Sequence, residues 1–124
     1  MTTPEKKVLI VEDNAIIAEG ISKAISIENY TIKKKLTDKI KDAINLLNTH
    51  MFQLIILDLS LPDGSGLEIL KMLNEKKVEK NVLVFSTNIH LKRICLKYGA
   101  YAFFDKATDF DELVKTSKSL LLYS

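Results

Sequence analysis

The run Leu54-Ile55-Ile56-Leu57-Asp58 places four apolar residues before an aspartate, and Val8-Leu9-Ile10-Val11-Glu12-Asp13 places four before two acids. Residues 82–85 form a third continuously apolar run. A strand that is apolar at every position is covered on both faces, as central strands of a parallel sheet are. Residues 30–33 and 101–104 complete five predicted strands, and the lysine-bearing strand 30–33 is expected at an edge.

The segments between these strands have helical spacing, because apolar residues recur every three or four positions. Five strands alternating with five helices predict a flavodoxin-like (βα)5 fold, a doubly wound five-stranded parallel sheet of order 2-1-3-4-5. Gly99 is expected to end the fourth helix, and Thr108, with Asp111 three residues later, to start the fifth. The five apolar stripes are Ile17, Ile21 and Ala24; Ile40, Ala43, Ile44 and Leu47; Leu67, Leu70 and Leu73; Leu91, Ile94 and Cys95; and Leu113, Val114, Leu120 and Leu121.

The composition fits one domain, because 124 residues with 47% hydrophobic and 27% charged types form a typical single core. We expect a single domain over 1–124, with a core of about 7–122 and no output domain in this chain. The net charge is +2, and the clusters 33–35, 76–77 and 92–93 are interpreted as solvated surface in preference to an anion site. No nucleic-acid recognition motif accompanies them, which predicts no direct nucleic-acid binding.

We expect no signal peptide or membrane span, because residues 1–7 are polar and the apolar run that follows has four residues. A lone cysteine, Cys95, excludes an intramolecular disulfide and fits a reducing compartment. These features predict a cytoplasmic protein that makes no membrane contact.

Polar residues follow four of the predicted strands: Glu12-Asp13, Asp58, Ser86-Thr87 and Lys106. The carboxyl ends of parallel strands share one edge of the sheet, and ligands bind there where the strand order reverses, between strands one and three. Three crowded carboxylates repel one another unless a cation neutralises them. Mg²⁺, which prefers oxygen ligands, is the expected ion, and Lys106 adds a positive charge.

A carboxylate at such a site can attack phosphorus to form an aspartyl phosphate. The expected roles are nucleophile for Asp58, and contacts to phosphoryl oxygens for Lys106 and the Ser86 hydroxyl. Taken singly, each residue also has an ordinary interpretation. Glu12-Asp13 is a polar strand end, Asp58 a turn cap, Ser86-Thr87 a helix N-cap and Lys106 solvated surface.

The segments 8–14, 57–66, 85–87 and 103–106, in this order and spacing, resemble the two-component response-regulator receiver family. The resemblance covers residues 7 to about 122 and implies that a sensor histidine kinase or phosphotransfer protein phosphorylates Asp58. It implies Mg²⁺, or alternatively Mn²⁺, held by Asp13, Asp58 and the Ser60 backbone carbonyl, with Glu12 completing the acidic pair.

The resemblance also implies a switch. Ser86, with Thr87 beside it, matches the hydroxyl position, Lys106 the family's lysine, and Phe103 the aromatic position of strand five. Phosphorylation then changes the affinity of helix four, strand five and helix five for an unidentified downstream protein or output domain. Such a domain is a phosphoacceptor and not a conventional enzyme.

Three residues depart from the common pattern of the family. Phe103 lacks the hydroxyl of a tyrosine, Ala107 stands where a proline is common, and Glu12 replaces an aspartate. Without that proline we expect no cis peptide bond after Lys106. The longer Glu12 side chain is expected to reach the metal through water.

Three other functions stay open at this stage. A phosphohydrolase of the haloacid dehalogenase type has a second aspartate two residues after its nucleophile, where this chain has Ser60. A pseudo-receiver would bind a partner constitutively, and the intact set of Asp13, Asp58, Ser86 and Lys106 disfavours it. A flavodoxin-like nucleotide binder needs a glycine-rich loop after the first strand, which residues 14–17 are not.

Overall fold

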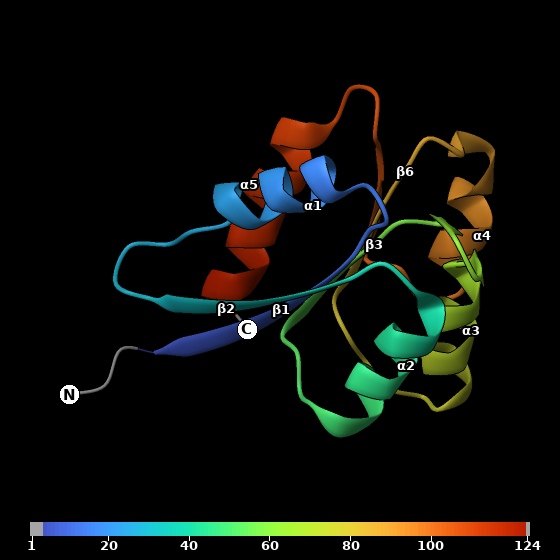
Figure 1. Ribbon diagram of the computed structural model, residues 1–124, viewed down its shortest axis with the longest axis horizontal. Coiled ribbons are helices and arrows are strands. Elements are labelled where there is room, and N and C mark those ends of the chain that lie inside the picture. The colour runs from blue at the N-terminus through green and yellow to red at the C-terminus, as the bar shows by residue number, and fades with distance from the viewer. Residues whose placement is uncertain (1–3, 124) are drawn as a thin grey trace.

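The computed structural model describes residues 4–123, so Met1, Thr2, Thr3 and Ser124 of the predicted domain lie outside the described residues. The main sheet has five parallel strands in the order β2-β1-β3-β6-β7, the predicted order with β6 and β7 as fourth and fifth strands (Figure 1). The strands are β1 (Glu5–Val11), β2 (Thr31–Thr37), β3 (Leu54–Leu57), β6 (Val82–Ser86) and β7 (Ala102–Asp105).

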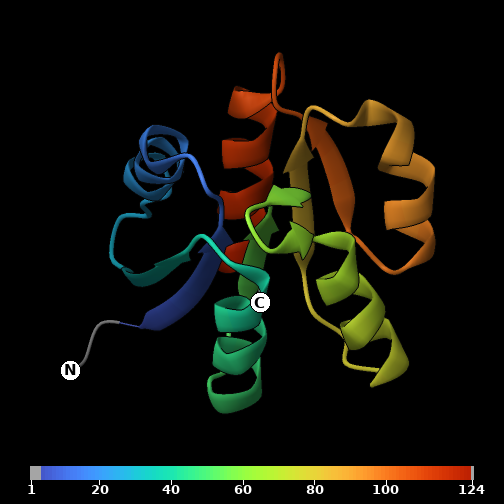
Figure 2. The ribbon, with the colours of Figure 1, turned by 45° about the vertical axis from the view of Figure 1, so that its right-hand side comes forward.

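Five α-helices cover both faces of this sheet: α1 (Ala15–Ala24), α2 (Ile40–Thr49), α3 (Leu67–Glu75), α4 (Lys92–Lys97) and α5 (Phe110–Leu122). Alternate residues of β1 belong to two hydrophobic clusters. Leu9 and Val11 pack with residues of α2, α3 and α4, whereas Val8 and Ile10 pack with residues of α1 and α5. The three central apolar strands are therefore covered on both sides, as their composition predicts (Figure 2).

The edge strand β2 differs from its prediction in length. It runs to Thr37 because all seven of its residues pair with β1, from Glu5↔Thr31 to Val11↔Thr37. The predicted strand covers only 30–33, whereas the lysines at 34 and 35 also belong to β2. Their positions alternate between the two faces, so an exposed edge strand accepts them.

The helix ends also differ in part from the prediction. The fourth segment begins as a short 3-10 turn, Ile89–Leu91, and Gly99 follows α4 with a φ of +94°, as expected. Thr108 was the wrong N-cap, because α5 begins after Asp109 and the Thr108 hydroxyl donates to Asp109 Oδ1 instead. No α-helix among residues 4–123 is long and apolar enough to cross a bilayer.

The turn-rich loop after β3 forms a small antiparallel hairpin of β4 (Ser60–Leu61) and β5 (Gly64–Ser65), light green in Figure 2. The hairpin is fastened to α2, because the Asp63 carboxylate accepts the backbone N–H groups of Ile40 at 2.9 Å and Lys41 at 3.1 Å. A second backbone hydrogen bond closes the hairpin, because the Gly66 N–H after β5 donates to the Leu59 carbonyl before β4 at 2.8 Å.

Candidate functional site

The predicted site residues gather at the carboxyl edge of the sheet. Glu12 and Asp13 follow β1, and Asp58 follows β3, which pairs with β1 through Val11↔Leu57. The two strands lead to helices on opposite faces, so this edge is the reversal point of the sheet. Carboxylate oxygens of Glu12, Asp13 and Asp58 lie within 4.8 Å of one another, which makes the trio a candidate metal site.

Lys106 joins two of these acids. Its Nζ lies 2.7 Å from Glu12 Oε1 and 3.1 Å from Asp58 Oδ2, and its side chain is 15% exposed. Glu12 and Asp58 are both buried, so their negative charges need this close cation. Asp13, in contrast, is exposed and open to solvent ligands.

Backbone hydrogen bonds fix the main-chain positions of Asp58 and Lys106. The Asp58 N–H donates to the Val11 carbonyl at 2.9 Å, which locks the end of β3 to the end of β1. The Lys106 N–H donates to the Ser86 carbonyl at 3.0 Å and so holds the lysine beside β6. Main-chain pairing therefore sets the geometry of the site, because the charged residues follow the ends of three strands, β1, β3 and β7, at the same edge of the sheet.

The protonation equilibria reflect burial among charges. Burial raises the pKa of Glu12 to about 6, against the lowering effect of its hydrogen bond with Lys106. Burial by itself would lower the pKa of Lys106, but the hydrogen bond to Glu12 and the charge of Asp58 outweigh it, so this pKa is raised. Lys106 is therefore a fixed cation at neutral pH.

The hydroxyl residues lie at the end of β6. Ser86 is buried, and its Oγ accepts the Asn88 N–H at 3.0 Å. The Asn88 side-chain amide in turn donates to Ser60 Oγ at 3.5 Å, linking the loop after β6 to the hairpin after Asp58. The Thr87 side chain is exposed.

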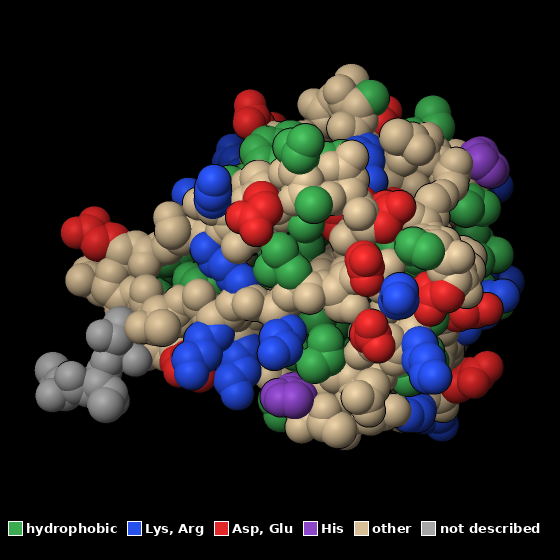
Figure 3. All heavy atoms as spheres, viewed as in Figure 1, with side chains coloured by type: hydrophobic (Ala, Val, Ile, Leu, Met, Phe, Trp, Pro, Cys, Tyr) green, Lys and Arg blue, Asp and Glu red, His purple; other side chains and the backbone are tan. Residues whose placement is uncertain are grey.

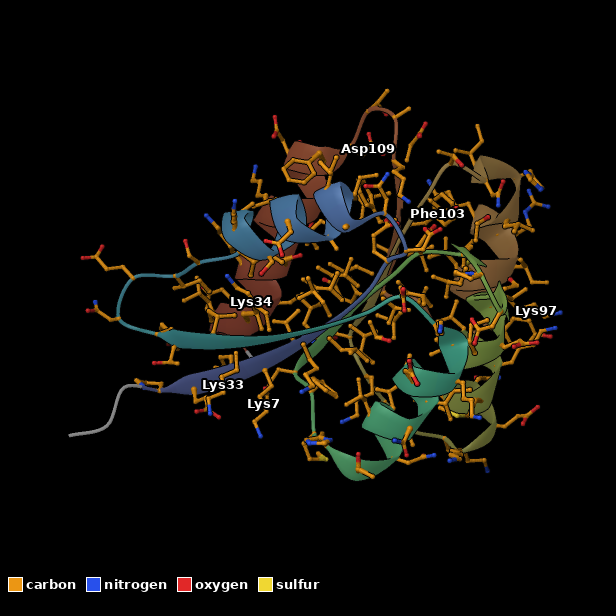
Figure 4. All side chains as sticks on the ribbon, viewed as in Figure 1. Lys7, Lys33, Lys34, Lys97, Phe103 and Asp109 are labelled. Carbon is orange, nitrogen blue, oxygen red and sulfur yellow. The ribbon has the colours of Figure 1, made fainter. Side chains whose placement is uncertain are left out.

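Phe103 lies on β7 opposite Val84 of β6, and it is buried in the cluster formed with α2, α3 and α4 (Figure 4). Its ring therefore packs inside the domain and does not project into solvent. Residues 4–123 contain no cis peptide bond, as the alanine after Lys106 predicts.

Sequence reasoning missed two residues that shape the site. Asp63 caps α2 from a distance of 23 positions along the chain, a contact that no local pattern reveals. Gly66 is required sterically, because a Cβ there would lie 2.2 Å from the Asp58 carbonyl oxygen. The loop signal of residues 62–66 indicated a turn there but not these contacts.

The fold and the edge chemistry define a doubly wound α/β domain with an acidic site closed by a lysine. Residues 8–118 match the family described as response regulator receiver domain, and the chain belongs to this family. Curated relatives include the cell cycle response regulator CtrA of Brucella ovis and of Brucella abortus, each 34% identical over 110 residues. The match covers 87% of this chain but 47% of each relative, so the chain spans about half of their length.

Solved structures agree with this assignment. The Francisella response regulator 1452 receiver domain superposes with a TM-score of 0.83 at 26% identity, over 95% of this chain and 98% of that one. TrrA from Thermotoga maritima, solved in complex with Mg²⁺ and BeF, gives 0.79 at 27% identity, over 94% and 99%. The signal receiver domain of a LuxO repressor protein from Vibrio parahaemolyticus gives 0.83 at 29%, over 96% and 92%.

Proposed function

We propose that this receiver domain accepts a phosphoryl group on Asp58 from a sensor histidine kinase or a phosphotransfer protein, and that the modification changes what the domain binds. The observation that carries the proposal is the position of Lys106, whose ammonium lies between Glu12 and Asp58. Charge neutralisation and positioning are the main requirements of phosphoryl transfer, and this edge supplies both.

In the proposed reaction, an oxygen of the Asp58 carboxylate bonds to phosphorus while the bond from phosphorus to the donor nitrogen breaks, and the nitrogen keeps the electron pair. Lys106 Nζ, 3.1 Å from Asp58 Oδ2, is placed to donate to an oxygen of the incoming group. Ser86, whose side chain is buried at the end of β6, supplies a second donor.

The donor set fits a hard divalent cation. Glu12, Asp13 and Asp58 offer oxygen ligands within 4.8 Å of one another, and the exposure of Asp13 leaves room for water ligands. We propose that Asp13, Asp58 and the Ser60 carbonyl hold Mg²⁺, or Mn²⁺, with Glu12 reaching it through water. Such an ion would neutralise the negative charge on the phosphoryl oxygens.

The signalling surface that we propose is formed by α4, β7 and α5. Exposed apolar side chains occur along it: Leu96 of α4 is 43% exposed, Tyr101, directly before β7, is 57% exposed, and Phe110, the first residue of α5, is 37% exposed. Ser86 ends β6, the strand that pairs with β7, and Phe103 lies on β7, so changes at the site reach this surface through directly paired strands. A downstream protein or output domain is the proposed binding partner, and the cytoplasm is the proposed location.

Intact-mass spectrometry tests this proposal. The chain is incubated with Mg²⁺ and acetyl phosphate beside the variant Asp58→Asn and beside a sample containing EDTA. We expect one added phosphoryl group on the wild-type chain with Mg²⁺, and none on the other two. No addition, with Mg²⁺ binding established separately, would favour the pseudo-receiver alternative.

The phosphohydrolase alternative has less support. An acid or base two residues after the nucleophile would be needed, and that position holds Ser60, whose hydroxyl accepts from Asn88. We therefore propose a phosphoacceptor domain and not a conventional enzyme.

A further inference from the structure

Three lysines share one face at the β1–β2 end of the sheet. Lys7 and Lys33 are Cα partners, and Lys35 is two residues beyond Lys33, so all three side chains point to the same side. Lys34 points to the other side, where its ammonium donates to the Ser22 carbonyl. Figure 4 shows Lys7 and Lys33 on the side of the sheet opposite Lys34, and Figure 3 shows basic side chains gathered on this face.

These lysines border a groove of about 430 Å³. The exposed His50 and the buried Phe52, which follow the end of α2, also line it. Glu5 lies 3.4 Å from Lys33, but no carboxylate of residues 4–123 lies within 4 Å of Lys7 or Lys35. The groove therefore has an excess of positive charge. Its lining residues are Lys7, Lys33, Lys34, Lys35, His50 and Phe52.

The groove adjoins an open strand edge, because β2 is the outermost strand of the sheet. The Thr31 N–H donates to the Pro4 carbonyl, and the Thr37 carbonyl accepts the Glu12 N–H, so the peptide groups of 31, 33, 35 and 37 face β1. Those of Ile32, Lys34 and Leu36 then face away from the sheet. Outward-facing N–H and C=O groups are a template for another strand.

We propose that the β2 edge and the lysine groove bind an extended acidic segment of a partner protein by strand addition. An added strand would place alternate side chains beside Lys33 and Lys35, on the face of the groove. Successive side chains on one face are about 6.8 Å apart in both strands, so acids at every second position match the two lysines. Lysines on an edge discourage pairing with other strands, and acids on the added strand replace that penalty by cross-strand attraction, so an acidic strand is favoured.

A polypeptide fits this surface better than a nucleic acid does. Single-stranded nucleic acids bind through aromatic side chains on which the bases stack, and the one phenylalanine of the groove is buried. The outward N–H and C=O groups of β2 alternate, and only another extended backbone pairs with that alternation. Asp58 does not line this groove, so peptide binding here is independent of the proposed phosphorylation.

The test uses two labelled, capped peptides of one composition. In the first, glutamate and valine alternate; in the second, pairs of glutamates alternate with pairs of valines, so no two acids are two residues apart. Fluorescence polarisation measures their binding to the full chain. We expect the alternating peptide to bind at least about fivefold more tightly, because only it places acids at successive positions of one face, opposite both Lys33 and Lys35. The same affinity should weaken as NaCl is raised.

Two variants locate the site. Lys35→Glu should weaken binding of the alternating peptide about fivefold or more, since it reverses one cross-strand pair. Lys97→Glu, an exposed residue of α4, changes the net charge equally and should leave binding unchanged. Asp58→Asn should bind like the wild-type chain.

Amide hydrogen exchange, followed by NMR, tests the strand pairing directly and needs no variant of the chain. Bound peptide should slow exchange of the Ile32, Lys34 and Leu36 amides, and N-methylation of the peptide backbone should abolish binding. Equal binding of both peptide isomers, equal binding of a single-stranded oligonucleotide, or unchanged exchange at these amides would overturn the proposal.

Discussion

At the scale of single residues, Lys106 is the cation on which the acidic edge depends. Lys106→Met would leave the buried Glu12 and Asp58 without their close positive partner. The pKa of Glu12, raised by burial, would rise further because the hydrogen bond and charge of Lys106 that lower it are lost. We expect phosphorylation by acetyl phosphate to slow about 100-fold, the usual effect of removing one transition-state donor. The measurement is the initial rate of mass increase at fixed Mg²⁺ and donor, with Lys97→Met as the control. A rate within threefold of wild type would contradict the role given to Lys106.

Gly66 tests the steric requirement beside the acceptor residue. In Gly66→Ala the new methyl group would meet the Asp58 carbonyl oxygen at 2.2 Å, so the backbone must move. We expect a loss of about 2 kcal/mol of unfolding free energy in urea, typical of overpacking. Gly20→Ala is the matched control, because nothing lies within 4 Å of its added methyl group and alanine favours the interior of α1. Gly66→Ala as stable as the wild type would contradict the steric account.

At the scale of elements, Asp63 joins the hairpin to α2. The N–H groups of Ile40 and Lys41 hold the pKa of this carboxylate below its ordinary value of 3.8. A lowered pKa in the folded state contributes stability above about pH 4, and this contribution is lost as the pH falls through 3.8 and below. Asp63→Asn should therefore be less stable than wild type at pH 7, with the difference shrinking toward pH 3. Urea unfolding followed by circular dichroism measures it, and a difference independent of pH would contradict the cap.

The same contact shows where sequence reasoning succeeded and where it stopped. The strands were predictable because apolar runs are local signals. Their order, and hence the meeting of Glu12, Asp13, Asp58 and Lys106 at one edge, followed from the doubly wound arrangement that alternating strands and helices imply. The start of α2 could not be predicted, because its N–H groups are capped by Asp63, which lies 23 positions later in the loop after β3. Thr108 failed as a cap for a different, local reason: its hydroxyl donates to Asp109 Oδ1, and the other oxygen of that carboxylate accepts the Asp105 N–H.

At the scale of the whole molecule, a ligand that binds only the folded chain must stabilise it. Mg²⁺ at a hundred times its dissociation constant should add about 2.7 kcal/mol. For a domain of this size that shift raises Tm by roughly 10 °C. Asp13→Asn removes one of the three carboxylates and should need more Mg²⁺ for the same shift. Differential scanning calorimetry over a Mg²⁺ titration measures both, and equal titrations for the two proteins would contradict the ligand assignment.

The central claim is that phosphorylation occurs at Asp58 and at no other residue, and reductive tandem mass spectrometry tests it most directly. Borohydride reduces an acyl phosphate to the alcohol, so a phosphorylated aspartate becomes homoserine, which peptide fragmentation locates. After treatment with Mg²⁺ and acetyl phosphate, the account predicts homoserine at position 58 and unmodified acids at positions 12 and 13. Homoserine at position 13, 5-hydroxynorvaline (the alcohol that a phosphorylated glutamate gives) at position 12, or no reduced residue in a chain that has gained phosphoryl mass, would contradict it.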